Sequence, residues 1–158
     1  MILIMFVCHG NICRSPMAEF VFKDLVKKRG LEDLFMIASS ATSTEELGNP
    51  VHHGTRNKLK KYGISTDGKR SVQLSKKDYE KYDYLIAMDG RNITNIHRII
   101  GHDSKKIVSK LLDFTENPRD IADPWYTGNF DQTYSDIYEG CEVLLNCILK
   151  SEGLNKLN

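Results

Sequence analysis

The 158-residue sequence has no apolar run at its start that is long enough to cross a lipid bilayer. The opening stretch MILIMFV covers residues 1–7, whereas a membrane-spanning helix needs about 20 apolar residues. This stretch also lacks the charged start and the small-residue cleavage site of a signal peptide. We therefore expect a soluble cytoplasmic protein without a membrane partner, in which residues 1–7 supply a buried strand.

The sequence also has little net charge and few cysteines. Its 22 basic and 21 acidic residues leave a formal charge of +1 without a long block of one sign, so a nucleic acid is not expected as a partner. Its five histidines lack ligand spacing with a cysteine pair, so we expect no metal and no other cofactor. The four cysteines lie in one loop and one helical pattern, which is typical of free thiols in a reducing cytosol.

Strand-like and helix-like segments alternate along the chain. Continuously apolar strands that alternate with helices are typical of a parallel sheet covered on both faces. We therefore predict an α/β fold with one domain over residues 1–158, a three-layer open sheet of four parallel strands with helices on both faces. The predicted strands are residues 2–7, 35–39, 84–88 and 107–110, and the predicted helices cover 16–29, 50–62, a segment from 75, 93–100 and 137–148.

Cap residues suggest where the first helices begin. Ser15 suits the N-cap of a helix with Pro16 in its first position, and Asn49 suits the N-cap of the helix over residues 50–62. Residues 113–128 are expected to be a loop. Ligands of open parallel sheets bind outside the carboxyl ends of the strands, so the loop after the first strand is the first place to search for a site.

Cys8 and Arg14 enclose five residues in that loop, CHGNICR. Gly10 and Asn11 tolerate unusual backbone angles, so the loop can curl until successive amides face one anion. The helix that starts near Ser15 adds its positive end, and Arg14 adds a planar fork that fits two phosphate oxygens. The same positive field favours a thiolate, so we expect Cys8 to be an ionised nucleophile rather than a buried structural cysteine.

An aryl phosphate ester also needs a proton donor for its leaving oxygen. The candidate is Asp123, in the segment ADPWY at residues 122–126. Pro124 stiffens this segment, and Trp125 and Tyr126 can stack along a phenyl ring. Taken alone, an Asp-Pro pair is more often a simple turn, and only the nucleophile loop makes Asp123 a candidate acid.

These segments resemble the low-molecular-weight protein tyrosine phosphatases. The likeness rests on VCHGNICRSP and extends through SSATSTEELGNP and MDGRN to ADPWY, over nearly the whole chain. It implies hydrolysis of phosphotyrosine proteins or small aryl phosphates through a cysteinyl-phosphate intermediate, with inorganic phosphate as product and no metal. It implies that Asp123 is the general acid and that the substrate-binding residues are His9, Gly10, Asn11, Ile12, Cys13, Ser15, Trp125 and Tyr126.

The resemblance implies a supporting hydrogen-bond network around the loop. Asn11, Ser15 and Ser39 match the positions that hold the loop in shape, and Ser15 also matches a hydroxyl that stabilises the departing thiolate. Each of the three is also an ordinary turn or cap residue. Two positions depart from the family pattern: Lys69 stands where the family usually has a histidine, and Val72 where it often has arginine. The resemblance therefore does not predict whether residues 69 and 72 support the loop.

The remaining cysteines separate rival functions. Cys13 matches a family cysteine that can form a reversible disulfide with the nucleophile, or it is a small packing residue. An arsenate reductase on the same fold needs further redox cysteines in the middle of the chain, but none occurs between Cys13 and Cys141. A non-catalytic phosphopeptide binder would not need Asp123. The phosphatase interpretation is therefore preferred over both rivals.

Overall fold

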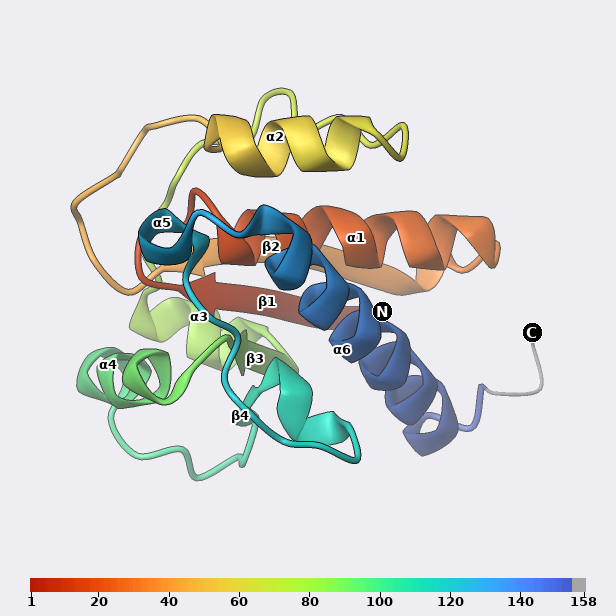
Figure 1. Ribbon diagram of the computed structural model, residues 1–158. Coiled ribbons are helices and arrows are strands. Elements are labelled where there is room, and N and C mark those ends of the chain that lie inside the picture. Colours follow the sequence, from red (N-terminus) through yellow and green to blue (C-terminus); the bar gives the residue numbers. More distant parts are fainter. Residues whose placement is uncertain (155–158) are drawn as a thin grey trace.

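The centre of the fold is a parallel sheet. The computed structural model describes residues 1–154, in which four strands pair in the order β2-β1-β3-β4, all parallel (Figure 1). The predicted fold class is confirmed, with small differences at the strand ends. The strands are β1 (Ile2–Cys8), β2 (Phe35–Ala41), β3 (Tyr84–Ala87) and β4 (Val108–Lys110).

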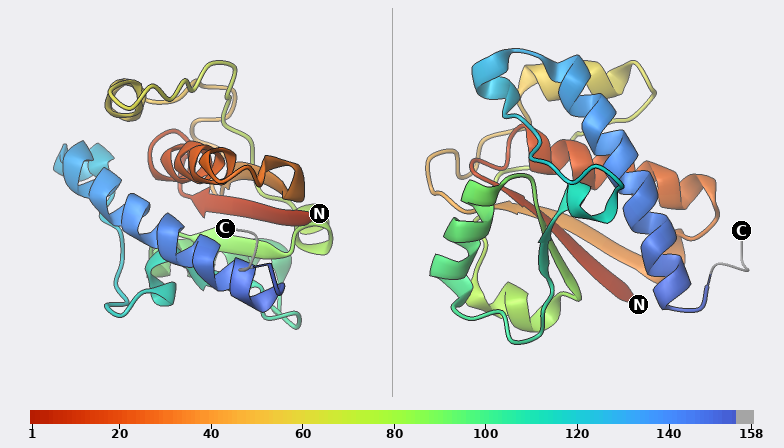
Figure 2. Two further views of the ribbon diagram at one scale, coloured as in Figure 1. Left: turned by 90° about the vertical axis from the view of Figure 1, so that its right-hand side faces the viewer. Right: turned by 60° about the horizontal axis from the view of Figure 1, so that its bottom comes forward.

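Helices cover both faces of the sheet (Figures 1 and 2). The long helix α6 lies across α1 and the short helix η2 on one face, as the right-hand view of Figure 2 shows, and α2 lies beyond α1. The opposite face is covered by α3 and α4. The helices are α1 (Arg14–Lys28), η1 (Glu32–Leu34), α2 (His53–Lys60), α3 (Lys76–Lys81), α4 (Gly90–Ile100), η2 (Leu111–Phe114), α5 (Pro124–Thr127) and α6 (Phe130–Ser151).

β1 is buried on both of its faces. Its side chains alternate, so that Ile4 and Phe6 pack into the core shared with α1 and α6, while Met5 and Val7 pack into the core shared with α3 and α4. An apolar residue is therefore favourable at every position, which explains the continuous apolar run at the start of the chain. This double burial fixes the end of β1, where the loop of residues 8–14 begins.

The first helix starts earlier than predicted. Cys13 occupies the N-cap position of α1 without a capping hydrogen bond from its side chain, so the prediction of Ser15 as N-cap is wrong. Ser15 lies in the first turn instead, where its hydroxyl contacts Cys8 and Asn11. The hydroxyl therefore contacts residues of the preceding loop and does not cap the helix.

α2 begins later than predicted, and His52 rather than Asn49 is its N-cap. The imidazole Nδ1 of His52 accepts a hydrogen bond from the N–H of Gly54 at 3.0 Å. The residues before His52 cannot continue the helix, because Pro50 is extended in an antiparallel bridge with Arg70. A contact between distant segments therefore sets this helix boundary.

The segment 113–128, predicted as a loop, contains one turn of helix, α5. Asp123 is its N-cap, and Asp123 Oδ1 accepts a hydrogen bond from the N–H of Trp125 at 3.0 Å. Gly128 ends the turn with a φ of 70°, in the left-handed region that glycine adopts without strain. The carboxyl group of Asp123 is thus held at a defined place rather than on a free loop.

α6 approaches η2 closely at Gly140, which gives a first prediction. A Cβ added to Gly140 would lie 2.5 Å from Leu111 Cγ, so alanine must push the two helices apart. We expect Gly140→Ala to lower the free energy of unfolding by about 1–2 kcal/mol, although alanine favours a helix. Urea unfolding followed by circular dichroism measures this. Gly90→Ala in α4, where the added Cβ meets open space, is the control and should not destabilise; equal stabilities of the two variants would contradict the close approach.

Candidate active site

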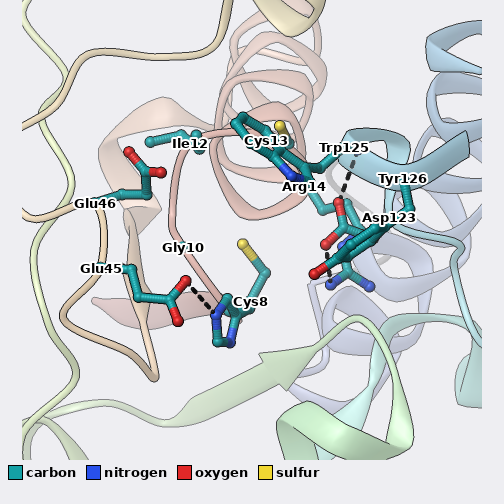
Figure 3. Close-up of a pocket in the computed structure, with 11 residues that line it drawn as sticks. Cys8, Gly10, Ile12, Cys13, Arg14, Glu45, Glu46, Asp123, Trp125 and Tyr126 are labelled. Carbon is teal, nitrogen blue, oxygen red and sulfur yellow. Dashed lines mark hydrogen bonds and ion pairs between the residues drawn. The ribbon is translucent and has the colours of Figure 1, made fainter. Parts of the chain in front are cut away.

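The loop of residues 8–14 lines a cavity of about 110 Å³ at the carboxyl end of the sheet (Figure 3). Cys8 is buried except for its face on this cavity, and the loop brings it to the same cavity as Arg14 and Asp123. The loop of residues 42–48 closes the opposite wall. The lining residues are Cys8, His9, Gly10, Ile12, Cys13, Arg14, Glu45, Glu46, Asp123, Trp125 and Tyr126.

Asn11 gives the loop its curl. Its φ of 58° lies in the left-handed region, where a side chain costs energy and asparagine costs less than most. Its Nδ2 donates hydrogen bonds to Ser15 Oγ at 2.8 Å and Ser39 Oγ at 2.9 Å, and its Oδ1 accepts one from the N–H of Val72 at 3.1 Å. The three predicted supporting residues therefore meet directly, and Val72 takes part through its backbone while its side chain is half exposed.

The Cys8 sulfur lies at the centre of this arrangement. Cys8 Sγ is 3.1 Å from Ser15 Oγ and accepts a hydrogen bond from the N–H of Asn11 at 3.3 Å. Asn11 Nδ2 already donates to Ser15 Oγ, and the other acceptor in reach of the Ser15 hydroxyl is the carbonyl oxygen of Ser40 at 3.4 Å, so the hydroxyl hydrogen can turn to the closer sulfur. Two hydrogen-bonding groups therefore lie at the Cys8 sulfur.

The amides of the loop are available for an anion. Among the described residues, the N–H groups of Gly10, Ile12 and Cys13 have no protein acceptor, and the N-terminus of the 15-residue helix α1 follows directly. Oriented amides and a helix N-terminus together favour a bound phosphate dianion. Burial, together with the nearby Cys8 sulfur, raises the pKa of Cys13 to about 12, so Cys13 is a neutral thiol at pH 7. All four cysteines are free, and the Cys8–Cys13 disulfide stays a prediction.

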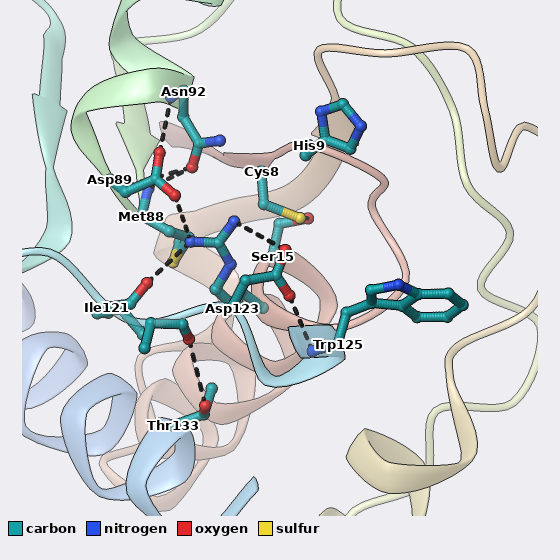
Figure 4. A network of polar contacts seen from close by, with 12 residues as sticks. Cys8, His9, Ser15, Met88, Asp89, Asn92, Ile121, Asp123, Trp125 and Thr133 are labelled. Carbon is teal, nitrogen blue, oxygen red and sulfur yellow. Dashed lines mark hydrogen bonds and ion pairs between the residues drawn. The ribbon is translucent and has the colours of Figure 1, made fainter. Parts of the chain in front are cut away.

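Arg14 is buried and engaged by two carboxylates. These belong to Asp89 and Asp123, both labelled in Figure 4. Its Nη1 donates to Asp89 Oδ2 at 2.6 Å and to the carbonyl oxygen of Ile121 at 2.8 Å, and its Nη2 lies 3.5 Å from Asp123 Oδ2. Burial alone would lower the pKa of Arg14, but the Cys8 sulfur and the Asp89 carboxylate hold it above its ordinary value. The guanidinium therefore keeps its charge beside the Cys8 sulfur.

Asp89 is the functional residue that the sequence reasoning missed. It is the N-cap of α4, where its Oδ1 accepts a hydrogen bond from the N–H of Asn92 at 2.8 Å and its Oδ2 is left for Arg14. Asn92 completes a capping box through its own Oδ1, which accepts a hydrogen bond from the N–H of Asp89 at 3.2 Å. The available signal was an Asp with Asn three residues later, directly after a parallel strand, at the edge of the sheet where sites form.

Asp123 reaches the cavity beside the second amino group of Arg14, Nη2, whereas Asp89 pairs with Nη1. Residues 121 and 122, which precede Asp123, are anchored at the end of β3. The N–H of Ile121 donates a hydrogen bond to the carbonyl oxygen of Met88 at 2.9 Å. Asp123 Oδ1 caps α5, which leaves Oδ2 facing Arg14 and the cavity. Trp125 and Tyr126 follow, with 56% and 82% of their surface exposed, and form the aromatic wall of the cavity (Figure 3).

Two glutamates stand at the mouth of the cavity, across from the aromatic wall (Figure 3). Glu45 Oε2 lies 3.0 Å from His9 Nε2, and Glu46 Oε2 accepts a hydrogen bond from Asn49 Nδ2 at 2.6 Å. The pair of His9 and Glu45 joins the loop of residues 8–14 (the phosphate loop) to the loop of residues 42–48. This side of the mouth is therefore acidic.

Lys69 supports the loop of residues 8–14 indirectly, through Ser39. Its Nζ donates to the carbonyl oxygen of Ser39 at 2.8 Å and lies 3.8 Å from Glu19 Oε1. The same carboxylate oxygen accepts a hydrogen bond from Ser39 Oγ at 2.6 Å, and Ser39 in turn accepts from Asn11. Burial lowers the pKa of Lys69, while the Glu19 carboxylate opposes this change. An ammonium group therefore occupies the position that the family pattern gives to an imidazole, and it remains connected to the loop.

The described residues contain neither a metal-binding cluster nor a membrane-spanning helix. No group of three or more histidine, cysteine, aspartate or glutamate side chains within residues 1–154 is arranged to hold a metal ion. Within the same range, each helix is too short or too polar to cross a membrane.

Comparisons with known proteins give similar chains over nearly the full length. A family model described as low molecular weight phosphotyrosine protein phosphatase matches residues 3–156. The chain is 44% identical over 156 residues to the low molecular weight protein-tyrosine-phosphatase YfkJ of Bacillus subtilis, covering 98% of this chain and 100% of that protein. It is 39% identical over 157 residues to the low molecular weight protein-tyrosine-phosphatase PtpA of Staphylococcus epidermidis, covering 99% of each.

Solved structures agree with these matches. The crystal structure of YfkJ from Bacillus subtilis superposes with a TM-score of 0.92 at 44% identity and covers 96% of each chain. The crystal structure of SP-PTP, a low molecular weight protein tyrosine phosphatase from Streptococcus pyogenes, gives a TM-score of 0.87 at 40% identity and covers 100% of each chain. The likeness in fold therefore extends over nearly the whole chain.

The buried position of Lys69 yields a second prediction. Lys69→Met leaves the carbonyl oxygen of Ser39 without its donor and removes one of the cations beside Glu19, so we expect the free energy of unfolding to fall by about 1–3 kcal/mol. Urea unfolding measures the change. Lys77→Met, at an exposed position of α3, is the matched control and should change stability by less than about 0.5 kcal/mol. Equal stabilities of the two variants would make Lys69 a spectator.

Proposed function

The chain belongs to the low molecular weight phosphotyrosine protein phosphatase family, and we propose that Cys8, Arg14 and Asp123 are its nucleophile, phosphate clamp and general acid. As a member of that family it is a cysteine-dependent protein tyrosine phosphatase. One observation carries the proposed roles: a single cavity is lined by the Cys8 sulfur, the Arg14 guanidinium and the Asp123 carboxyl group. A thiolate, a cation and a proton donor around one cavity are what transfer of a phosphoryl group from an aryl ester requires.

In the first step, the Cys8 thiolate attacks phosphorus in line with the leaving aryl oxygen. The sulfur–phosphorus bond forms as the bond from phosphorus to the aryl oxygen breaks, and Asp123 gives its proton to that oxygen. Arg14 and the free amides of the loop hold the other phosphate oxygens, whose charge they stabilise. The 3.5 Å separation of Arg14 Nη2 and Asp123 Oδ2 is long for a charge-assisted hydrogen bond, which leaves Nη2 able to bind phosphate.

In the second step, water attacks the cysteinyl-phosphate. Asp123, now a carboxylate, takes a proton from the attacking water, and the bond between sulfur and phosphorus breaks to release inorganic phosphate. The Ser15 hydroxyl, 3.1 Å from Cys8 Sγ, donates a hydrogen bond to the departing thiolate. Asp89 acts through Arg14, because its fixed carboxylate holds the guanidinium beside the cavity during both steps.

The aromatic wall supports aryl phosphates as substrates. Trp125 and Tyr126 offer two exposed rings beside the phosphate loop, and a phenyl ring can stack on such a wall. A phosphotyrosine of a protein or a small aryl phosphate ester fits this description, with inorganic phosphate as product. Neither rival function is favoured by an observation, since no cysteine lies between Cys13 and Cys141 and the Asp123 carboxyl group faces the cavity.

The role of Cys8 is tested by removing the thiol. Cys8→Ser places a weakly acidic hydroxyl at the position of the sulfur, so we expect kcat for para-nitrophenyl phosphate to fall below about one-thousandth of the wild-type value. The release of para-nitrophenolate, followed by its absorbance, measures this rate. Cys147→Ser, at an exposed position of α6, serves as the control and should be fully active. Near-normal turnover by Cys8→Ser would refute the proposed chemistry.

The role of Asp123 is tested by leaving groups of different acidity. Asparagine is also a good N-cap, so Asp123→Asn preserves α5 while it removes the proton. We expect kcat/KM for phenyl phosphate, which reports only the steps up to release of the aryl group, to fall by about 10²–10⁴-fold. The kcat/KM for para-nitrophenyl phosphate should fall much less, because para-nitrophenolate leaves without protonation. Steady-state rates on the two esters provide the measurement. Equal losses on both esters would exclude Asp123 as general acid.

A further inference from the structure

A row of stacked rings lies behind the aromatic wall and joins α2, α5 and α6. The His52 ring stacks on the His53 ring, with centroids 4.2 Å apart, and on the Phe130 ring at 5.3 Å and 14° between planes. It meets Trp125 edge to face, at 5.6 Å and 75°. Trp125 lines the catalytic cavity, whereas His52 does not. The indole of the cavity wall therefore rests on a ring outside the cavity.

The His52 ring has little freedom to move. Its Nδ1 accepts the hydrogen bond from Gly54 that caps α2, and its backbone N–H donates to the carbonyl oxygen of Ile12 in the phosphate loop at 2.9 Å. On the other side, Phe130 packs so closely on Gly54 that an added Cβ would lie 2.3 Å from its ring. His52 is thus fixed relative to the phosphate loop, α2 and the start of α6 at once.

We propose that His52 is a positioning residue for the substrate's aryl group: its neutral imidazole holds the Trp125 indole where that indole can stack on the ring of the bound ester. The proposal rests on the proposed function, because it assumes that an aryl phosphate occupies the cavity. The indole is more than half exposed, so few contacts other than His52 restrain it. A looser indole offers less binding energy to the aryl ring, while the phosphate loop, which is held by other contacts, is unchanged.

The surroundings of His52 keep its imidazole neutral. Burial, followed by the nearby cations of α2, lowers the pKa of His52 below the ordinary 6.5, and two carboxylates oppose this. As the pH falls through 6.5 the unfolded chain takes up the proton first, so this contribution to stability is present above pH 6.5 and is lost as the pH falls. Protonation of Nδ1 also removes the acceptor of the α2 cap. The charged groups that act on the ring are His53 and Arg56 of α2, Glu46 of the loop of residues 42–48 and Asp123 before α5. On α6, Asp131 follows Phe130 and pairs with Lys58.

Two substitutions separate the ring of His52 from its cap. His52→Asn retains a capping side chain but removes the ring, whereas His52→Phe retains a ring but removes the Nδ1 acceptor. We expect His52→Asn to raise KM for phenyl phosphate by about two- to tenfold, with kcat within about twofold of wild type, because it removes a contact made by both bound ester and transition state. His52→Phe should keep a near-normal KM with a lower Tm. His53→Asn, whose ring contacts His52 but not the cavity, is the matched control with a wild-type KM.

A wild-type KM for His52→Asn, or equal rises of KM for His52→Asn and His52→Phe, would overturn the proposal. Wild-type protein that fails to hydrolyse phenyl phosphate would refute the proposed function instead, so the two failures are distinct. Thermal unfolding of each variant shows that it is folded. If His52→Asn does not fold, His52→Phe and the fluorescence measurement below still decide the outcome.

Trp125 is the only tryptophan of the chain, so its fluorescence reports on this contact without any turnover. A protonated imidazole quenches a neighbouring indole, so wild-type emission should fall with decreasing pH around a midpoint below 6.5. The inflection should be absent from His52→Phe. It should move to higher pH in His53→Asn, because that substitution removes a cation that disfavours protonation of His52. An unchanged inflection in His52→Phe would show that His52 does not act on Trp125.

Discussion

The left-handed turn at Asn11 is the constraint on which the catalytic site depends. A side chain at φ 58° costs roughly 1–3 kcal/mol in most residues and less in asparagine. The Asn11 side chain donates two hydrogen bonds and accepts one, and these three bonds offset this cost. Each adds about 0.5–1.5 kcal/mol net to the free energy of unfolding. Because the turn reverses the chain within a few residues, the Cys8 sulfur, the free amides and the N-terminus of α1 all meet at one cavity. A helix that continued directly from β1 would not bring them together.

Arg14 connects this turn with segments far along the chain. A buried guanidinium is tolerated only when its charge and its N–H groups have partners, and here they come from Asp89, Ile121 and Asp123. These partners lie on α4 and on the segment that precedes α5. The same contacts that satisfy the buried charge therefore place Asp123, the proposed proton donor, at the cavity that Cys8 lines. Stability and catalytic geometry have a common origin at this residue.

The sequence predicted what local patterns determine. The apolar run of β1, the alternation of strands and helices, and the spacing of Cys8 and Arg14 are visible within short windows, and the fold class and the cavity follow from them. The misses have a different cause. Asp89 looks like an ordinary helix cap until folding brings Arg14 to it, and the start of α2 depends on the bridge between Pro50 and Arg70. The local pattern shows the helix cap at Asp89, but it does not show which distant residue the cap contacts.

Lys69 could be identified as a departure from the family pattern, but its effect could not be predicted. A lysine can weaken such a network by bringing in an unpaired buried charge, or support it if a carboxylate is near. The second case holds, because Glu19 lies on the same face of α1 as Ser15, four residues before Lys23, and accepts from Ser39 while it faces the ammonium group. What the network requires at this position is a donor to the Ser39 carbonyl oxygen and a positive charge beside Glu19, and both lysine and histidine can meet that need.

In the proposed mechanism, the phosphate and the aryl group are held by different kinds of structure. Asn11, Arg14 and Ser15 are almost fully buried and hold one another through hydrogen bonds, whose geometry allows little variation. Trp125 and Tyr126 are exposed, and the indole is restrained by ring contacts, which tolerate wider changes of angle and distance. The buried network sets the chemistry, which is the same for every aryl ester. The exposed wall can therefore change, and with it the preference among substrates, without disturbing the groups that break the bond to phosphorus.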